Sequence, residues 1–258
     1  MLDFHDKLTQ GHRIEKSSKR ILCVTCRVLQ REVYLCASRS PNIVDVVLMP
    51  QGLHNDPNVL RDELTKQISR TSDEQGNTYD AVVLGYGLCS NGVVGLEPEI
   101  PLVIPRGHDC VTLLLGSKDR YRDHFDSHRG IYWYSRGWIE HCLMPGKERY
   151  EFTYNRYLEK YGEENAKFLM EVEETWMNEY SIAAYIEWPE LPSEKFKDFT
   201  KDCAKYLNWE FQQLQGSSQL LQDLVDGNWN EDDFLAAEPG QMIDQDLTNS
   251  GIITAVDA

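Results

Sequence analysis

Four short, mostly apolar runs, each ended by a polar or glycine-rich turn, constrain the fold of this 258-residue chain more than any other feature. They lie at 20–24, 44–49, 80–84 and 101–105. Apolar residues follow one another in these runs and do not alternate with polar ones. Such continuous runs are typical of strands that are covered on both faces of a parallel sheet.

Helix-like stretches at 26–37, 58–70 and 109–125 follow three of these runs. An alternation of strand and helix is typical of right-handed βαβ units around a parallel sheet. Only a short crossover helix fits between Leu84 and Leu102, so we expect the third and fourth strands to lie close together. The predicted fold class is therefore α/β, a Rossmann-like, mostly parallel sheet with helices on both faces.

The second half of the chain is less regular. We expect an aromatic loop at 132–138, a short helix near 139–143 and a long acidic helix at 163–180. The remaining predicted elements are strands at 182–188, 209–214 and 234–237, and helices at 193–207 and 217–226. In this half the elements at 139–180 are predicted to form a helical excursion from the α/β unit.

No Gly/Ser-rich or Pro-rich linker divides the two halves, so we predict one composite α/β domain over residues 1–258. It would contain a regular βαβ half at 20–130 and a second α/β half at 131–243. The segments 1–18 and 244–258 show little periodicity and are expected to be flexible.

Charge and cysteine content exclude several classes of protein. The chain has 42 acidic residues against 26 Lys and Arg, a net charge of -16, which disfavours nucleic-acid and anionic-membrane binding. No apolar run is long enough for a transmembrane helix, and the N-terminus lacks the features of a signal peptide. Seven cysteines without an export signal indicate a reduced, cytoplasmic protein with free thiols or thiolate ligands.

Cysteine and histidine recur where the predicted strands end. Because ligands bind at the carboxyl ends of parallel strands, these side chains are expected to converge at one edge of the sheet. Thiolates and imidazoles gathered in one place are ligands of Zn²⁺ or iron. The candidate metal ligands are Cys89, His108, Cys110, Cys23 and His54. We expect zinc rather than iron, with an iron-sulfur cluster on Cys23, Cys89 and Cys110 as a further possibility.

Each candidate ligand also has a simpler interpretation. Cys23 lies inside an apolar run and fits a buried packing residue, or with Cys26 a redox pair. His54 fits a residue that lines or caps a turn. Cys89 differs, because its segment 85–92 is polar and glycine-rich, which suits a loop that approaches an anion or metal rather than a core. This segment departs from the dinucleotide-binding pattern G-x-G-x-x-G.

Residues beside these ligands are candidates for binding a substrate. Asp109 is expected to cap the helix that follows it, and it could also orient a ligand histidine. Arg106 could clamp a carboxylate or phosphate, as could Arg129 and Arg136; the alternative for all three is a surface ion pair. The aromatic segment would form either a pocket wall or a core plug. The candidate substrate-binding residues are Gly85, Tyr86, Gly87, Asn91, Arg106, Tyr134 and Trp138.

Four motifs resemble those of the family known as "domain of unknown function 1638", over roughly residues 20–240. They are LMPQGLHN at 48–55, LGYGLCSNG at 84–92, PLVIPRGHDC at 101–110, and YWYS at 132–135 with Gly137-Trp138. The resemblance implies no established activity. It implies an association with anaerobic one-carbon metabolism, near corrinoid-dependent methyltransferase systems. The motifs contain Cys89, His108 and Cys110, which strengthens these three candidates.

Two functions from different classes follow. The first is a metal-dependent cytoplasmic protein of small-molecule metabolism, with methyl transfer as one form of it and a transferase or lyase as the enzyme class. The second is a non-enzymatic accessory protein that binds a metal, a corrinoid or a partner methyltransferase. An open coordination position beside a pocket would favour the first, and a saturated Cys/His shell would favour the second.

Overall fold

A five-stranded, mostly parallel sheet forms the centre of the molecule in the computed structural model, which describes residues 18–128, 130–247 and 252–258. Its strand order is β2 (Ile43–Met49), β1 (Arg20–Cys26), β3 (Ala81–Gly85), β4 (Leu102–Pro105) and β8 (Phe234–Ala237). The first four strands are parallel, and β8 pairs antiparallel with β4. The predicted α/β fold class is confirmed. All residues of β3 and β4 are buried, as their continuous apolar runs predict.

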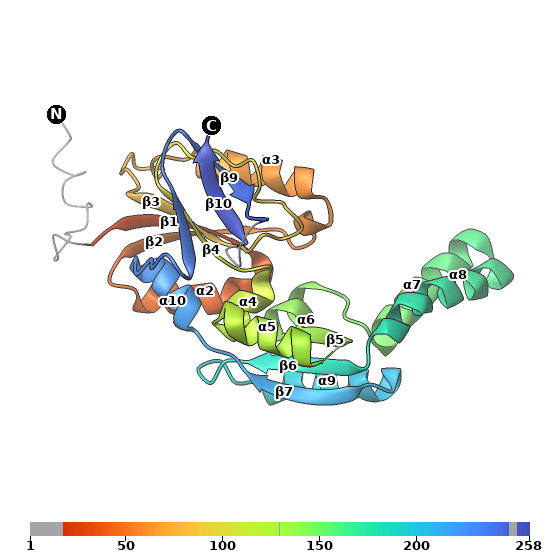
Figure 1. Cartoon of the computed structure of the whole chain (residues 1–258). Helices are drawn as coiled ribbons and strands as arrows, with labels where there is room; N and C mark the ends of the chain where they lie inside the picture. Colours follow the sequence, from red (N-terminus) through yellow and green to blue (C-terminus); the bar gives the residue numbers. More distant parts are fainter. Residues whose placement is uncertain (1–17, 129, 248–251) are drawn as a thin grey trace.

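Helices cover both faces of this sheet (Figure 1). On one face, the short η1 (Arg27–Leu29) leads into α2 (Gln30–Arg39), which packs against α10 (Gln219–Asp226). On the other lies α3 (Pro57–Ile68), whose apolar side chains at helical spacing, Leu60, Leu64 and Ile68, are buried. The antiparallel pair β9 (Gln241–Gln245) and β10 (Ile253–Asp257) lies on the same side of the sheet as α3.

The second half of the chain forms a separate three-stranded parallel sheet. Its order is β5 (Ile131–Ser135), β6 (Ile182–Glu187) and β7 (Glu210–Gln215), with α6 (Arg136–His141) after β5 and α9 (Glu194–Leu207) before β7. The prediction of an aromatic loop at 132–138 is wrong, because this segment contains most of β5 and the start of α6. The Ser135 hydroxyl caps α6 by accepting a hydrogen bond from the Trp138 backbone N–H at 3.3 Å.

The predicted helical excursion takes the form of a two-helix arm. It consists of α7 (Lys147–Tyr161) and α8 (Glu163–Thr175), and it projects from the rest of the molecule in Figure 1. The short η3 (Trp176–Glu179) leads back into β6. The acidic helix predicted at 163–180 is present as α8 followed by η3. Helix α7 was not predicted; Gly162, at a positive φ of 79°, separates it from α8.

Three further expectations differ from the structure. The connection from β3 to β4 contains turns instead of a crossover helix, although β3 and β4 are neighbours as expected. The predicted helix at 109–125 is broken at Gly116 into α4 (Cys110–Leu115) and α5 (Lys118–Ser127). At the C-terminus, 253–257 form β10 although the sequence shows little periodicity there, because backbone pairing with β9 supplies the hydrogen bonds. Residues 1–17, which were also expected to be flexible, lie outside the described residues.

The two sheets meet where α6 packs against η1. At this contact a Cβ atom on Gly137 would lie 1.7 Å from the carbonyl oxygen of Val28, so only glycine fits. Ile186 and Trp188, at the end of β6, join the apolar core of the central sheet. Within the described residues, no helix combines the length and the apolar character needed to cross a membrane.

Candidate functional site

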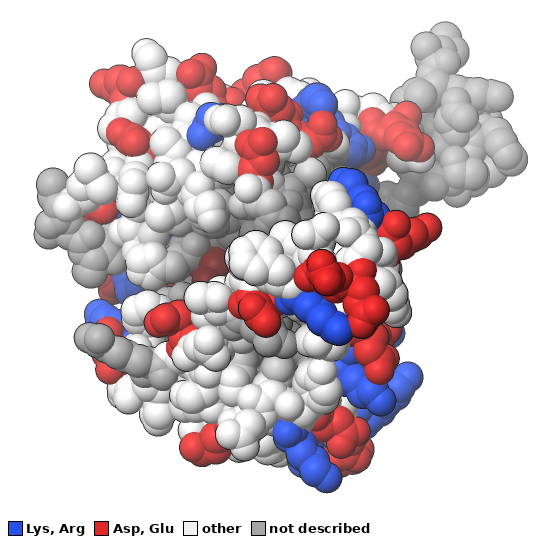
Figure 2. Space-filling model, turned by 90° about the vertical axis from the view of Figure 1, so that its right-hand side faces the viewer, with Lys and Arg blue, Asp and Glu red and all other residues white. Residues whose placement is uncertain are grey.

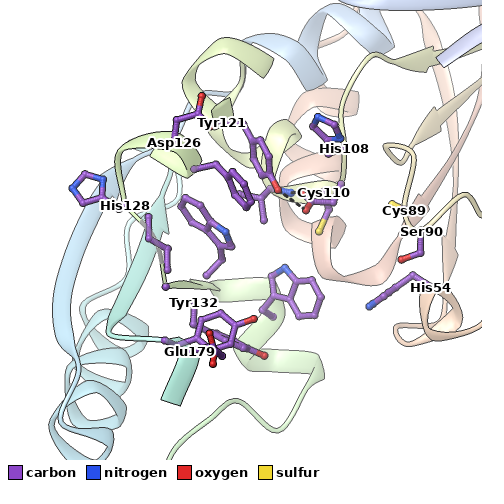
Figure 3. Close-up of a pocket in the computed structure, with 18 residues that line it drawn as sticks. His54, Cys89, Ser90, His108, Cys110, Tyr121, Asp126, His128, Tyr132 and Glu179 are labelled. Carbon is purple, nitrogen blue, oxygen red and sulfur yellow. Dashed lines mark hydrogen bonds between the residues drawn. The ribbon is translucent and has the colours of Figure 1, made fainter. Parts of the chain in front are cut away.

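A pocket of about 830 Å³ lies between the carboxyl edge of the central sheet and strand β5 of the second sheet (Figure 3). The strand order β2-β1-β3-β4 reverses its direction between β1 and β3, and open α/β sheets bind ligands outside the carboxyl ends of strands near such a switch point. The loops after β2, β3 and β4 supply one wall, and α5, β5 and α6 supply the other. The residues that line it include His54, Cys89, His108, Asp109, Cys110, Tyr121, Trp133 and Trp138.

Backbone hydrogen bonds between the loops after β3 and β4 hold the site's main residues together. The Leu88 N–H donates to the Gly107 carbonyl at 2.8 Å, and the Cys89 N–H donates to the His108 carbonyl at 2.9 Å. A Cβ atom on Gly87 would lie 2.5 Å from that Gly107 oxygen. The glycines of this motif therefore permit two loops to approach each other, and Gly85 and Gly87 are not among the lining residues of the pocket.

Four of the five predicted metal ligands line this pocket: His54, Cys89, His108 and Cys110. They come from the loops after three different strands, as the convergence argument predicts. Figure 3 shows the two cysteines and His108 on neighbouring loops and His54 below them.

Cys23 does not reach the pocket. Strand β1 continues to Cys26, so Cys23 lies in mid-strand, fully buried and paired with Val46 and Val83. Burial raises its pKa to about 12. Its placement near the end of the first strand was wrong, because the boundary of the apolar run came two residues before the end of the strand. The packing interpretation of Cys23 is the one that fits.

Cys26 takes the place expected for Cys23, at the carboxyl end of β1. Its thiol lies beside the buried Tyr86 hydroxyl, and the same hydroxyl is close to Cys89 and Cys110. Burial raises the pKa of Tyr86, and the thiols of Cys26, Cys89 and Cys110 add to the rise. Sequence reasoning considered Cys26 only as a partner of Cys23.

Burial sets the chemistry of the pocket thiols. It raises the pKa of Cys89 to about 12 and that of Cys110 well above its usual range, with the nearby Asp109 carboxyl adding to both shifts. Both thiols are therefore protonated at neutral pH. Because the thiolate is the nucleophile and the metal ligand, neither cysteine is activated in the metal-free protein.

No formed metal site is present in the part of the chain that the structure describes, because no three His, Cys, Asp or Glu side chains there are grouped so as to hold an ion. The candidate ligands share a pocket without sharing a coordination point. Binding of a metal by Cys89, His108 and Cys110 would require their side chains to turn toward one another and lose protons.

The two pocket histidines lie against aromatic rings. The His54 ring meets the edge of Trp138 at 5.9 Å between centroids, and His108 lies 5.8 Å from Tyr121. Burial lowers the pKa of His54, which favours the neutral imidazole, and the nearby Asp109 carboxyl acts in the opposite sense. A neutral imidazole is able to accept a proton or bind a metal.

Asp109 has the predicted capping role and a second contact in the pocket. One carboxyl oxygen accepts a hydrogen bond from the Val111 backbone N–H at 2.8 Å, which caps α4. The other accepts a hydrogen bond from the Tyr121 hydroxyl at 3.2 Å, drawn as a dashed line in Figure 3. Desolvation raises the pKa of this carboxyl, and these hydrogen bonds offset part of the rise.

Several predicted substrate-binding residues lie elsewhere. The Arg106 guanidinium donates to the backbone carbonyls of Glu231 and Phe234, at 2.9 and 3.2 Å, and to that of Ile253, so it ties β4 to the C-terminal strands. Tyr134 is fully buried, and its hydroxyl donates to the Pro145 carbonyl at 2.8 Å. Asn91 is exposed at φ 66°.

Of the other aromatic and arginine candidates, one lies in the pocket and one forms an ion pair at the surface. Trp138 lines the pocket as predicted. Arg136 forms an ion pair with Glu140 at 3.3 Å, which is the surface alternative. Arg129 lies outside the described residues.

The pocket-wall interpretation of the segment 132–138 holds for Tyr132, Trp133 and Trp138, but sequence reasoning missed the rings of α5. Tyr121 and Phe125 are one helical turn apart on α5, and Trp133 lies on β5 with its ring 6.3 Å from that of Tyr121. The spacing of Tyr121 and Phe125 is a signal for one helix face. Nothing in the sequence indicated that this face would meet β5, because that contact joins two separate sheets.

Comparison with known proteins gives one match. A family model described as "Protein of unknown function (DUF1638)" matches residues 48–225, which is more than half of the chain. The chain belongs to this family. The matched region begins at the end of β2, contains β3 to β7, and includes every lining residue of the pocket. Searches of curated proteins and of solved structures found no match.

Proposed function

We propose that this protein binds a small organic molecule in the pocket between its two sheets. The observation that carries the proposal is the location of the pocket, at the carboxyl edge of a parallel sheet, where loops from β2, β3 and β4 present cysteine, histidine and aspartate side chains. Its volume of about 830 Å³ falls in the range of small-molecule sites, and its mixture of aromatic walls with few polar groups is typical of them.

A ligand screen tests this proposal. Compounds that raise the melting temperature of the full chain should lose that effect in Trp138→Leu and in Tyr121→Leu, because both rings line the pocket. Trp229→Leu is the matched control, since it removes an indole that lies outside the pocket, against Lys19 just before β1. If stabilising compounds act equally on all three variants, the pocket is not their site and the proposal fails.

The second candidate function is a metal-dependent one, favoured by the presence of Cys89, His108 and Cys110 in one pocket with His54 beside them. Zinc suits two thiols and an imidazole better than iron does, and His54 or a substrate would take a remaining position. Bound zinc would activate a substrate thiol, as methyl transfer requires, or polarise a carbonyl group or a water molecule. A cluster on three cysteines would use Cys26, because Cys23 lies in mid-strand.

Metal analysis of protein purified without oxygen tests this second function. About one zinc per chain is expected in the wild type, with a loss in Cys89→Ser and in Cys110→Ser. Cys203→Ser, at a buried cysteine in α9 that does not line the pocket, should keep the metal. Stoichiometric metal in both pocket variants would contradict this ligand set. Iron with broad absorption near 400 nm would indicate a cluster instead.

An accessory role without turnover is the alternative class, with a corrinoid protein or a methyltransferase as the partner. The net charge of -16 suits association with a basic partner. Figure 2 shows acidic and basic side chains interspersed on one face, without a continuous basic patch among the described residues there, which supports the expectation of no nucleic-acid partner. The free state of all seven cysteines suits a reducing, cytoplasmic location.

A further inference from the structure

Aromatic rings from four separate segments face the pocket. They come from α5, β5, α6 and the residue after η3, and they are Tyr121, Phe125, Tyr132, Trp133, Trp138 and Tyr180. We call Tyr121, Trp133 and Trp138 the aromatic wall, since Tyr121 and Trp138 contact the pocket histidines and Trp133 stacks on Tyr121. Tyr121 stacks on Trp133 at 6.3 Å and holds Asp109 by its hydroxyl, while the Trp138 indole N–H faces the Cys110 thiol.

The charged residues of the lining are all acidic in the described part of the chain. Asp109, Asp126 and Glu179 line the pocket, and no Lys or Arg does so among the described residues. Asp109 is the partly buried one, and its oxygens contact a backbone N–H and a hydroxyl without a described Lys or Arg at ion-pair distance.

Elsewhere in the molecule, aromatic rings already have a cation. The Arg149 guanidinium lies 5.1 Å from the Trp176 ring centre, and the Lys19 ammonium lies 4.3 Å from that of Trp229. Within the described residues, the aromatic wall has no such partner. A ring face over which no cation lies, next to a carboxylate that lacks one, forms a site for a cation from outside the chain.

We infer that the pocket takes an organic cation with a methylated ammonium group, held against the aromatic wall with Asp109 as its counter-charge. This inference rests on the proposed binding of a small molecule in the same pocket and names its chemical class. A quaternary ammonium spreads its charge over methyl groups and gains from aromatic faces, because it has no N–H to satisfy. The overall charge of -16 adds long-range attraction for a cation.

Other classes of small molecule fit this pocket less well. An anion would meet three carboxylates without a described Lys or Arg to neutralise it. A primary ammonium is strongly hydrated and needs three hydrogen-bond acceptors, whereas each Asp109 oxygen already accepts one hydrogen bond and aromatic faces offer no acceptor to replace water. A neutral flat molecule would stack on the rings and leave the Asp109 charge uncompensated.

Calorimetric titration of the full chain with choline and with 3,3-dimethylbutan-1-ol tests the inference, because these two molecules share a shape and differ in charge. Choline should bind at least tenfold more tightly than the neutral alcohol. Asp109→Asn and Trp138→Leu should each weaken choline binding at least fivefold. Asn also caps helices, so Asp109→Asn should keep the fold. Trp229→Leu is the control that should bind choline normally.

Each outcome separates the cation inference from the proposed function. Equal affinity for choline and the alcohol, both lost in Trp138→Leu, would overturn the cation inference and leave the pocket as a binding site. Failure of correctly folded wild-type protein to bind choline would also overturn the cation inference. In that case the ligand screen would still decide whether the pocket binds a small molecule. Choline binding that persists in both Asp109→Asn and Trp138→Leu would place the cation elsewhere and overturn the inference as well.

Discussion

At the scale of single residues, Glu32 is the clearest case of a carboxyl group buried away from water. This α2 side chain is 5 % exposed, and its Oε2 atom has no hydrogen-bond partner among the described residues. Burial raises its pKa from 4.5 to about 7, with Arg136 offsetting part of the rise. Since the folded state holds this proton more tightly than the unfolded state does, Glu32 lowers the free energy of unfolding as pH rises from 4.5 to 7.

Glu32→Gln should therefore be more stable than the wild type at pH 8, by up to about 3 kcal/mol, and the difference should vanish toward pH 4.5. Urea unfolding at pH 5, 6, 7 and 8 measures this difference. Glu238→Gln, at an exposed turn, is the control and should show no such trend. A difference that is constant over this pH range would show that Glu32 does not hold its proton in the folded state.

The types of residue that follow the apolar runs located the pocket correctly, but they did not place every candidate residue correctly. Cys89, His108 and Cys110 were found because rare residue types followed apolar runs, and parallel pairing then brings the ends of such runs together. The placement of Cys23 at a strand end was wrong because the predicted strand ended two residues too early; apolar residues mark where a strand is buried and not where its hydrogen bonds end. The Arg106 prediction failed because its partners are backbone carbonyls from distant strands, which carry no sequence signal.

At the scale of elements, the loops after β3 and β4 depend on one close backbone approach. Gly87→Ala would place a Cβ atom 2.5 Å from the Gly107 oxygen and 2.7 Å from the Asp109 nitrogen. We expect a loss of about 2–4 kcal/mol in the free energy of unfolding and loss of ligand or metal binding at the pocket, since Cys89 and His108 would separate. Chemical denaturation and titration measure the two effects.

Gly240→Ala is the control for this variant. Gly240 has a positive φ of 89° and open space around its Cβ position, so it should cost about 1 kcal/mol through backbone strain and leave binding intact. A Gly87→Ala protein with wild-type stability and binding would show that the two loops tolerate separation. A loss of stability without a loss of binding would show that the close contact between the two loops stabilises the fold but is not needed for binding.

At the scale of the whole molecule, the first sheet was predictable and the relation between the two sheets was not. The alternation of apolar runs and helical stretches specifies β1 to β4 with α2 and α3, because each unit satisfies local pattern and burial together. The pocket, however, forms between that sheet and β5, which was predicted as a loop. Short aromatic strands such as 131–135 show neither a continuous apolar run nor clear alternation, so their pairing comes from tertiary contacts.

The position of the second sheet relative to the first depends most directly on Gly137. It lies in α6, next to the pocket residue Trp138, and its backbone touches Val28 of η1 so closely that any Cβ atom would overlap the carbonyl oxygen. Gly137→Ala must therefore push α6 away from η1 and carry Trp138 with it. We expect a loss of more than about 3 kcal/mol in the free energy of unfolding and a red shift of tryptophan emission.

Gly76→Ala is the control here, because Gly76 has a φ of 80° and no atom within 4 Å of its Cβ position, so strain alone should cost about 1 kcal/mol. Two unfolding transitions in Gly137→Ala would show that the two sheets fold independently and that α6 only docks them. A single transition at lower denaturant would show one cooperative unit. Wild-type unfolding together with wild-type ligand binding would mean that α6 does not set the position of the second sheet, and the pocket wall would then be held by β5 and α5 alone.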